Sequence, residues 1–189
     1  MNLLHTYFDC VFIIEPQVFE DYRGYFFESY SQQKFNDLTG LKINFVQDNE
    51  AKSSYGVLRG LHFQKTPYSQ SKLINVLKGA ILDVAVDIRK GSPTFGQYVS
   101  IELNEDNKYK LFIPRGFAHG YIVLSNKAIV QYKCDNYYYP ASERIIRFND
   151  PNIGIDWKIN EKSIILSDKD KNAPLLKDAC LFDYNQDLY

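Results

Sequence analysis

Short apolar segments follow one another along most of the chain and are separated by turn residues such as Gly79, Pro114 and Pro140. From Leu41 onward these segments are rich in β-branched and aromatic residues, which favour pleated strands. Their lengths and spacing are typical of a sandwich or barrel. The expected strands lie within residues 42–48, 56–64, 71–79, 80–89, 97–104, 109–116, 118–125, 128–134 and 143–150.

Some of these segments alternate apolar and polar residues, whereas others are continuously apolar. This mixture is expected when two sheets share one core and some strands are buried on both faces. The pattern predicts an all-β fold, an antiparallel β-sandwich or jelly roll with short peripheral helices. Ser31 and Gly40 bound the longest helix candidate, and another helical turn is expected within LLKD at 175–178. No repeat or linker divides the sequence, so residues 1–189 are expected to form a single domain.

The charges of the chain nearly cancel, with 22 Lys and Arg against 23 Asp and Glu. This balance does not favour nucleic acid or a membrane as partner, so an anionic ligand has to be gripped locally. Cys10, Cys134 and Cys180 form no CxxC pair, which argues against a disulfide framework and favours a cytoplasmic location. The N-terminal residues lack a signal-peptide pattern, and we expect a soluble, unprocessed protein.

The stretch GVLRGLHFQKTPYSQSK (56–72) combines a histidine with two cations. Arg59 offers a planar fork for carboxylate or phosphate, Lys72 a point charge, and His62 a group that titrates near neutrality. These groups are suited to holding an anion and moving a proton. Strict alternation places Arg59 and His62 on opposite faces, so they share a cavity only if the strand bulges at Gly60. The competing interpretation is a core histidine beside a surface arginine.

A second stretch, IPRGFAHGY (113–121), contains a P-x-G-x-x-H arrangement that ends at His119. It resembles the second motif of the cupin superfamily, whose fold is a small β-barrel or jelly roll. Metal-binding cupins add an H-x-H and a glutamate in their first motif, where this chain has His62 alone. Because His62 and His119 supply only two protein ligands, a catalytic metal is not expected.

Two further stretches carry candidate chemistry. Tyr132 lies on an apolar strand and is followed by the aromatic run NYYYP (136–140), which is either a packed turn or a platform for a flat base. In LSDKDKNAPLL (166–176), Asp168 and Asp170 flank Lys169. Such a cluster usually marks a solvated loop, but an inward Asp170 is able to hold a histidine tautomer and stabilise the imidazolium.

Taken together, these stretches closely resemble the dTDP-4-dehydrorhamnose 3,5-epimerase family. Nine motifs in register are strong evidence, although each is weak alone. They run in family order through nearly the whole chain: FEDYRGYFFES (19–29), FVQDN (45–49), GVLRGLHFQ (56–64), SQSKL (69–73), DVAVDIRKGSPTFG (83–96), IPRGFAHGY (113–121), YKCDNYYYP (132–140), FNDPNIGIDW (148–157) and LSDKD (166–170).

The resemblance implies a cupin-type jelly roll without metal or cofactor. It also implies a homodimer in which an N-terminal segment contributes to the neighbouring site. The implied reaction inverts C3 and C5 of dTDP-4-keto-6-deoxy-D-glucose to give dTDP-4-keto-L-rhamnose, in dTDP-L-rhamnose biosynthesis. Both carbons lie α to the C4 carbonyl, so a base, an acid and a group that stabilises the enolate oxygen are required.

The resemblance also implies a role for each candidate residue. His62 is the expected base, oriented by Asp170; Lys72 stabilises the enolate oxygen, and Tyr132 returns a proton from the opposite face. The remaining expectations concern binding of phosphate, sugar and nucleotide, with Tyr138 stacked on thymine. The expected substrate-binding residues are Arg23, Phe26, Glu28, Gln47, Asp48, Asn49, Arg59, His119, Tyr138, Glu143 and Lys169.

The sequence departs from the family pattern after QDN. Ala51 and Lys52 stand near a position where many members have a serine and an arginine, which is expected to alter contacts at the site rim. Epimerisation of C3 alone or C5 alone is an alternative activity, because pocket shape distinguishes these reactions. A metal-dependent cupin or a non-catalytic sugar-nucleotide binding module is also compatible with these motifs.

Overall fold

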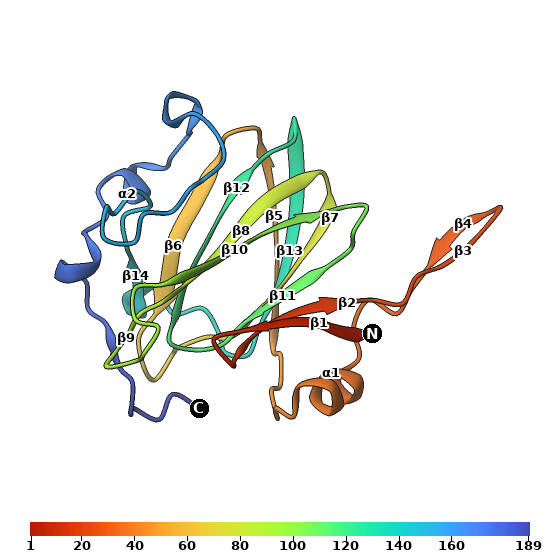
Figure 1. Cartoon of the computed structure of the whole chain (residues 1–189), viewed down its shortest axis with the longest axis horizontal. Helices are drawn as coiled ribbons and strands as arrows, with labels where there is room; N and C mark the ends of the chain where they lie inside the picture. Colours follow the sequence, from red (N-terminus) through yellow and green to blue (C-terminus); the bar gives the residue numbers. More distant parts are fainter.

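Two antiparallel sheets packed face to face form the body of the protein in the computed structural model, which describes residues 1–189 (Figure 1). The six-stranded sheet has the order β1 (Asn2–Tyr7), β2 (Val11–Glu15), β11 (Lys110–Ile113), β7 (Lys72–Lys78), β13 (Lys127–Cys134), β5 (Gln47–Ser54). The five-stranded sheet has the order β10 (Tyr98–Asn104), β8 (Ala80–Asp87), β12 (Phe117–Val123), β6 (Leu58–Gln64), β14 (Glu143–Ile145). The predicted all-β sandwich is confirmed.

The remaining elements are short. Two two-stranded sheets pair β3 (Phe19–Asp21) with β4 (Gly24–Phe26), and β9 (Arg89–Lys90) with β15 (Phe182–Asp183). The helical elements are α1 (Gln32–Thr39), α2 (Asp168–Lys171) and the 3-10 turns η1 (Pro140–Ser142), η2 (Glu161–Ser163) and η3 (Leu176–Asp178). None of the helices is long and apolar enough to cross a membrane.

Three clusters of buried apolar side chains hold the layers together. The cluster between the two sheets includes Ile74 and Val130 from one sheet and Ala85 from the other. A second cluster covers the outer face of the five-stranded sheet with the segment that contains Trp157, and a third packs α1 through Phe35 onto the six-stranded sheet. Because β8 is covered on both faces, its sequence is almost continuously apolar.

The predicted helix is confirmed together with its ends. The Ser31 hydroxyl accepts the N–H of Lys34 at 3.3 Å, and Gly40 adopts φ +71°, where its N–H donates to the carbonyl of Asn36. The turn expected within LLKD is also present, as η3.

The strand predicted over residues 42–48 is wrong, because pairing begins only at Gln47 and continues to Ser54. Residues 47–54 are polar apart from Ala51, and β5 is the edge strand of the six-stranded sheet, paired only with β13. The apolar residues just before it pack instead beside α1, where Ile43 and Phe45 contact Phe35 and its neighbours. The hydrophobic pattern therefore predicted a strand before Gln47, whereas the paired residues follow it.

Candidate active site

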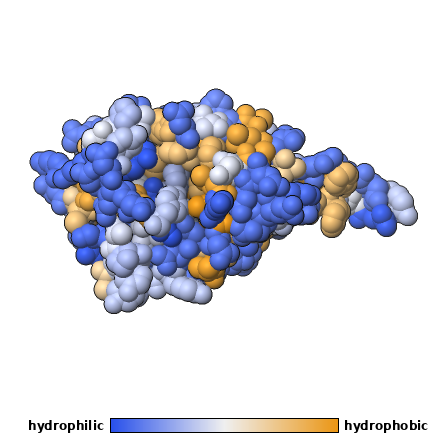
Figure 2. Space-filling view, turned by 90° about the horizontal axis from the view of Figure 1, so that it is seen from below, coloured by the Kyte–Doolittle hydropathy of each residue, from blue (hydrophilic) through white to orange (hydrophobic).

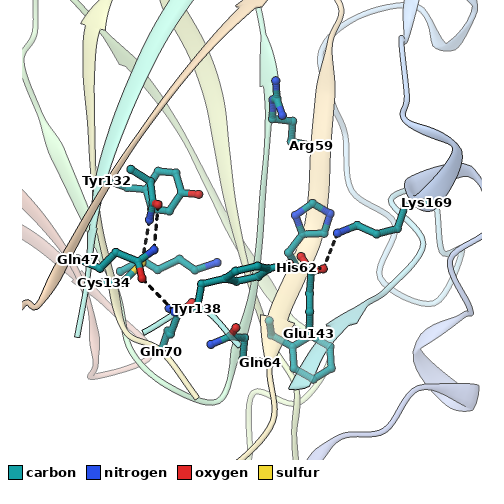
Figure 3. Close-up of a pocket in the computed structure, with 13 residues that line it drawn as sticks. Gln47, Arg59, His62, Gln64, Gln70, Tyr132, Cys134, Tyr138, Glu143 and Lys169 are labelled. Atoms are coloured by element: carbon teal, nitrogen blue, oxygen red, sulfur yellow. Dashed lines mark hydrogen bonds and ion pairs between the residues drawn. The ribbon is translucent and has the colours of Figure 1, made fainter. Parts of the chain in front are cut away.

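A cavity of about 360 Å³ opens between the two sheets and contains most of the predicted site residues (Figure 3). It is lined from one sheet by β5, β7 and β13 and from the other by β6 and β14, with α2 at its side. The predicted residues that line it are Gln47, Asn49, Arg59, His62, Lys72, Tyr132, Tyr138, Glu143 and Lys169.

His62 lies on β6 and is held from behind by Asp170. The Nε2 atom of His62 lies 2.6 Å from Oδ1 of Asp170, and the Asp170 side chain is 3% exposed against 25% for His62. Ser167, the N-cap of α2, donates its hydroxyl to Oδ2 of Asp170 at 2.7 Å. Burial raises the pKa of Asp170, but the hydrogen bonds from His62 and Ser167 outweigh it and lower this pKa below its ordinary value. An ionised Asp170 therefore fixes the tautomer of His62 and leaves the other ring nitrogen free.

Arg59 reaches the same cavity because β6 bulges. His62 pairs with His119 and Arg59 with Tyr121, so Gly60 and Leu61 together stand opposite one residue of β12. Gly60 has φ +132°, and a Cβ there would lie 2.5 Å from the Cα of the facing glycine. The expectation that Arg59 joins His62 only through an irregularity at Gly60 is confirmed.

Lys72 and Tyr132 come from the six-stranded sheet and face the cavity from β7 and β13. Burial lowers the pKa of the Lys72 ammonium, and the nearby Cys134, Asp83 and Glu143 only partly oppose this shift. Burial also raises the pKa of Tyr132 to about 12, so the hydroxyl remains a proton donor at neutral pH. His62 and Tyr132 therefore approach the cavity from the two opposite sheets.

Tyr138 lies across the mouth of the cavity in the loop after β13, where it is 50% exposed (Figure 3). Its N–H donates to Oε1 of Gln47 at 2.9 Å, and its hydroxyl donates to Oε2 of Glu143 at 3.2 Å. Glu143 also pairs with Lys169 at 2.7 Å. Burial raises the pKa of Glu143, but the hydrogen bond and charge of Lys169 outweigh this effect, so the pKa lies below its ordinary value. This end of the cavity thus offers an accessible aromatic ring beside a cation.

Two predicted residues on the two large sheets, Asp48 and His119, are not among those that line the cavity. Asp48 points to the opposite face of β5 from Gln47 and Asn49, and its carboxylate pairs with Lys133 at 2.9 Å. His119 is buried, and its Nε2 lies 2.5 Å from Oδ1 of Asp83. The expectation that Asp48 lines the cavity of its own chain is wrong, because strand alternation directs it to the other face of β5. His119 lies on the same face of its sheet as His62, its partner across the two strands, and stays a predicted binding residue.

Arg23, Phe26 and Glu28 lie outside the cavity of their own chain. Figures 1 and 2 show the β3–β4 hairpin extending away from the body. Phe26 is 71% exposed, Arg23 pairs with Asp21 inside the hairpin, and Glu28 pairs with Lys34 of α1. The structure therefore does not bring these residues to the other candidates within one chain.

The sequence interpretation missed four residues that also line the cavity, Phe63, Gln64, Gln70 and Cys134. Gln64 binds the aromatic loop: its Nε2 donates to the carbonyl of Tyr68 at 2.6 Å, and its Oε1 accepts the N–H of Tyr139 at 2.7 Å. Gln64 and Cys134 stand two positions after His62 and Tyr132 on the same strands, so the two-residue period of a strand is the signal that would have found them. Gln70 lies just before β7, outside any strand.

Asp83 and His119 form a second His–Asp pair, but no group of three or more His, Cys, Asp or Glu side chains is arranged to hold a metal ion. His62 on β6 is instead hydrogen-bonded to Asp170, and its partner His119 on β12 is hydrogen-bonded to Asp83.

Comparison with known proteins yields one consistent family. A family model described as dTDP-4-dehydrorhamnose 3,5-epimerase matches residues 5–178. The chain is 52% identical over 181 residues to the dTDP-4-dehydrorhamnose 3,5-epimerase of Salmonella typhimurium, covering 96% of this chain and 98% of that protein.

Two solved structures have the same fold at high identity. The dTDP-4-dehydrorhamnose 3,5-epimerase of Elizabethkingia anophelis is 55% identical with a TM-score of 0.90, covering 94% of this chain and 97% of the other. The dTDP-6-deoxy-D-glucose-3,5-epimerase of Legionella pneumophila, solved in complex with dTDP-4-keto-L-rhamnose, is 47% identical with a TM-score of 0.94, covering 98% and 99%.

Proposed function

Since the chain belongs to the dTDP-4-dehydrorhamnose 3,5-epimerase family and is therefore an isomerase, we propose that it inverts C3 and C5 of dTDP-4-keto-6-deoxy-D-glucose with His62 as base and Tyr132 as acid. The product is dTDP-4-keto-L-rhamnose, the compound bound in the Legionella pneumophila relative. The place of the enzyme is then in dTDP-L-rhamnose biosynthesis, which supplies a polysaccharide precursor.

One observation carries this proposal: His62 and Tyr132 face the same cavity from opposite sheets. Inversion at a carbon requires that a proton leaves one face and a proton arrives at the other. A sugar ring between the two sheets presents one face to each residue. The geometry thus fits inversion, whereas a module that only binds has no need for a base and an acid on opposite sides.

In the proposed step, the free ring nitrogen of His62 takes the proton from the carbon next to the C4 carbonyl. The electrons of the C–H bond form a carbon–carbon double bond, and the carbonyl electrons move onto the oxygen to give an enolate. Tyr132 then donates its proton to the opposite face while the carbonyl re-forms. Exchange with solvent removes the proton from His62 and restores that of Tyr132 before the second carbon reacts.

Lys72 and Asp170 support this proton transfer. The Lys72 ammonium lies in the same cavity and would stabilise the negative charge on the enolate oxygen, with a strength increased by its partial burial. Asp170 is ionised and stabilises the imidazolium that forms when His62 accepts a proton.

The exposed end of the cavity is suited to the dTDP part of the substrate. We assign Tyr138 to stacking on thymine and Arg59 and Lys169 to the anionic groups, with Gln47, Asn49 and Glu143 as polar contacts. The family resemblance adds a homodimer in which the β3–β4 hairpin brings Arg23, Phe26 and Glu28 to the neighbouring site. The exposure of this hairpin supports that assignment.

The proposal is tested by incubating the enzyme with dTDP-4-keto-6-deoxy-D-glucose in deuterated water and following the sugar by NMR. We expect deuterium at both C3 and C5. Label at one carbon only would reduce the activity to a C3-only or C5-only epimerase. A bound sugar that acquires no label would leave a non-catalytic binding module.

A further inference from the structure

The segment Ser69–Lys72 brings two side chains, Gln70 and Lys72, into the cavity, although only Lys72 belongs to a strand. The Lys72 ammonium makes no hydrogen bond or ion pair within the chain. Its position is therefore set by its own backbone, which pairs with Ile113 and Cys134 at the first residue of β7, and by the residues just before it. The contacts that hold Ser69 and Ser71, which are 1% and 0% exposed, accordingly bear on the catalytic geometry.

Asp135 holds this backbone from one side. The N–H of Ser71 donates to Oδ1 of Asp135 at 2.6 Å, and the N–H of Asp135 donates to the carbonyl of Ser71 at 3.3 Å. Arg115 donates its Nε–H to the other carboxylate oxygen at 3.0 Å, and the two side chains of this ion pair are 13% and 4% exposed. The pair is thus shielded from solvent, where it is stronger than a surface ion pair.

Leu188 and Tyr189 hold the same backbone from the other side. The Leu188 carbonyl accepts Nη1–H of Arg115 at 2.5 Å and the Ser69 hydroxyl at 3.3 Å. The Tyr189 hydroxyl lies 2.9 Å from Oγ of Ser71 and accepts the N–H of Arg115 at 3.3 Å, while its ring lies 4.8 Å from the guanidinium carbon. The leucine side chain is buried, which fixes this end of the chain in place.

We propose that Tyr189 is a positioning residue for catalysis, which acts through Ser71 to place Lys72 against the enolate oxygen. This inference rests on the proposed function, because it concerns the same reaction. The hydroxyl oxygen of Tyr189 accepts a hydrogen bond from the backbone N–H of Arg115, so its O–H is available to donate to Ser71. Lys72 and Tyr189 are 117 positions apart in the chain, and Ser71 alone links them in this way.

The test compares Tyr189→Phe with Tyr184→Phe in the deuterium-exchange assay and in steady-state kinetics. Tyr184 lies in the same segment and its ring also lies on an arginine, Arg89, but its hydroxyl makes no hydrogen bond. We expect Tyr189→Phe to lower kcat and both exchange rates by about three- to tenfold with KM unchanged, the scale of one hydrogen bond. Tyr184→Phe should keep the wild-type rates.

A double-variant cycle separates positioning from general stability. Ser71→Ala should lower kcat like Tyr189→Phe, and the two changes combined should cost little more than either alone. The proposal is overturned if Tyr189→Phe keeps the wild-type kcat, whether or not its melting temperature falls. It is also overturned if the double variant loses the product of the two single losses in kcat. If Tyr189→Phe does not fold, Ser71→Ala alone decides by the same kcat criterion. If the wild-type enzyme exchanges no deuterium, the proposed function fails first, whereas wild-type exchange with an unaffected variant removes only the role of Tyr189.

Discussion

Asp170 and His62 are 108 residues apart in the chain, and a carboxylate oxygen of the first lies 2.6 Å from a ring nitrogen of the second. Two elements meet to create this contact. The β6 strand supplies the histidine, and the short helix α2, capped by Ser167, supplies the aspartate. Because Asp170 is almost fully buried, its charge acts on His62 with little screening by solvent.

Asp170→Asn should lower kcat by about 10²- to 10⁴-fold, because the amide neither stabilises an imidazolium nor fixes the same tautomer. His62→Ala should abolish turnover and exchange altogether. Asp168→Asn is the matched control, since it lies in the same helix with a side chain that is 97% exposed. Steady-state kinetics distinguish the variants, and equal losses at 168 and 170 would contradict a direct role for the His62–Asp170 contact.

Tyr132→Phe should slow net inversion but still permit exchange at C5. The base is intact in this variant, so the enolate forms and regains a proton or deuteron from the original face, while the donor on the other face is missing. Tyr137→Phe, which changes a tyrosine that is 64% exposed in the adjacent loop, serves as control. Complete loss of exchange in Tyr132→Phe, equal to that of His62→Ala, would make the division into base and acid wrong.

Much of this arrangement could be predicted from the sequence, but predictions from alternation failed where the chain departs from regular structure. Alternation predicted the sheets, and the motifs predicted which residues bear chemistry. Arg59 and His62 reach the same cavity because β6 contains one extra residue. Regular alternation predicts the contrary, that the two side chains point to opposite faces. Asp48 was misplaced for a different reason, since a motif gives no information about which face of a strand each residue occupies.

The contacts that Gln64 makes with the aromatic loop were also beyond pattern analysis. The side chain of Gln64 binds the backbone at Tyr68, Tyr137 and Tyr139, so it fixes the loop that carries Tyr138. Nothing in the local sequence around Gln64 reports contacts more than 70 residues away, as that with Tyr137 is. Such contacts follow from the closure of the sandwich, which brings β6 beside the end of β13.

Lys110→Met should stabilise the protein at neutral pH by up to ~3 kcal/mol. Lys110 is 3% exposed and has no ion-pair partner within the chain, and burial followed by the nearby Lys133 lowers its pKa from 10.5 to about 8. The unfolded chain therefore binds more protons than the folded chain between about pH 8 and 10.5, so wild-type stability rises with pH through this window. The advantage of the variant should be constant below pH 8 and shrink above it.

Urea unfolding from pH 6 to 10, at one protein concentration, measures this difference. Lys78→Met is the control, because Lys78 is exposed on the neighbouring strand β7. A gap between Lys110→Met and wild type that stays constant across this range would show that the Lys110 ammonium is not desolvated in the folded protein.

Activity should survive exhaustive treatment with a chelator. His62 and His119 face one another across β6 and β12, but each is bonded to an aspartate that competes with a metal for the ring nitrogen. The proposed chemistry assigns the stabilisation of the enolate to Lys72 instead of a metal. Turnover is measured after treatment with a chelator and again after addition of divalent cations. Loss of turnover that is reversed by one cation would favour a metal-dependent cupin.

Mixing two inactive variants should restore activity if Arg23 acts on the neighbouring subunit. In a heterodimer of His62→Ala and Arg23→Ala, one site combines His62 of the second chain with Arg23 of the first and is complete. The ion pair of Arg23 lies within its own hairpin, with Asp21, and the hairpin extends away from the body of the protein (Figure 1), where another copy is able to meet it. We expect up to about half the wild-type kcat per heterodimer, since one of its two sites is intact.

Mixing His62→Ala with Tyr132→Phe is the control for this experiment. Both residues line the cavity of one chain, so neither site of that heterodimer is complete and activity should stay low. Subunits are exchanged by mild denaturation and refolding together, and heterodimers are separated by a tag on one chain. If the Arg23→Ala mixture remains as inactive as this control while heterodimers form, Arg23 does not serve the neighbouring site, and the hairpin's exposed aromatic residues need another partner.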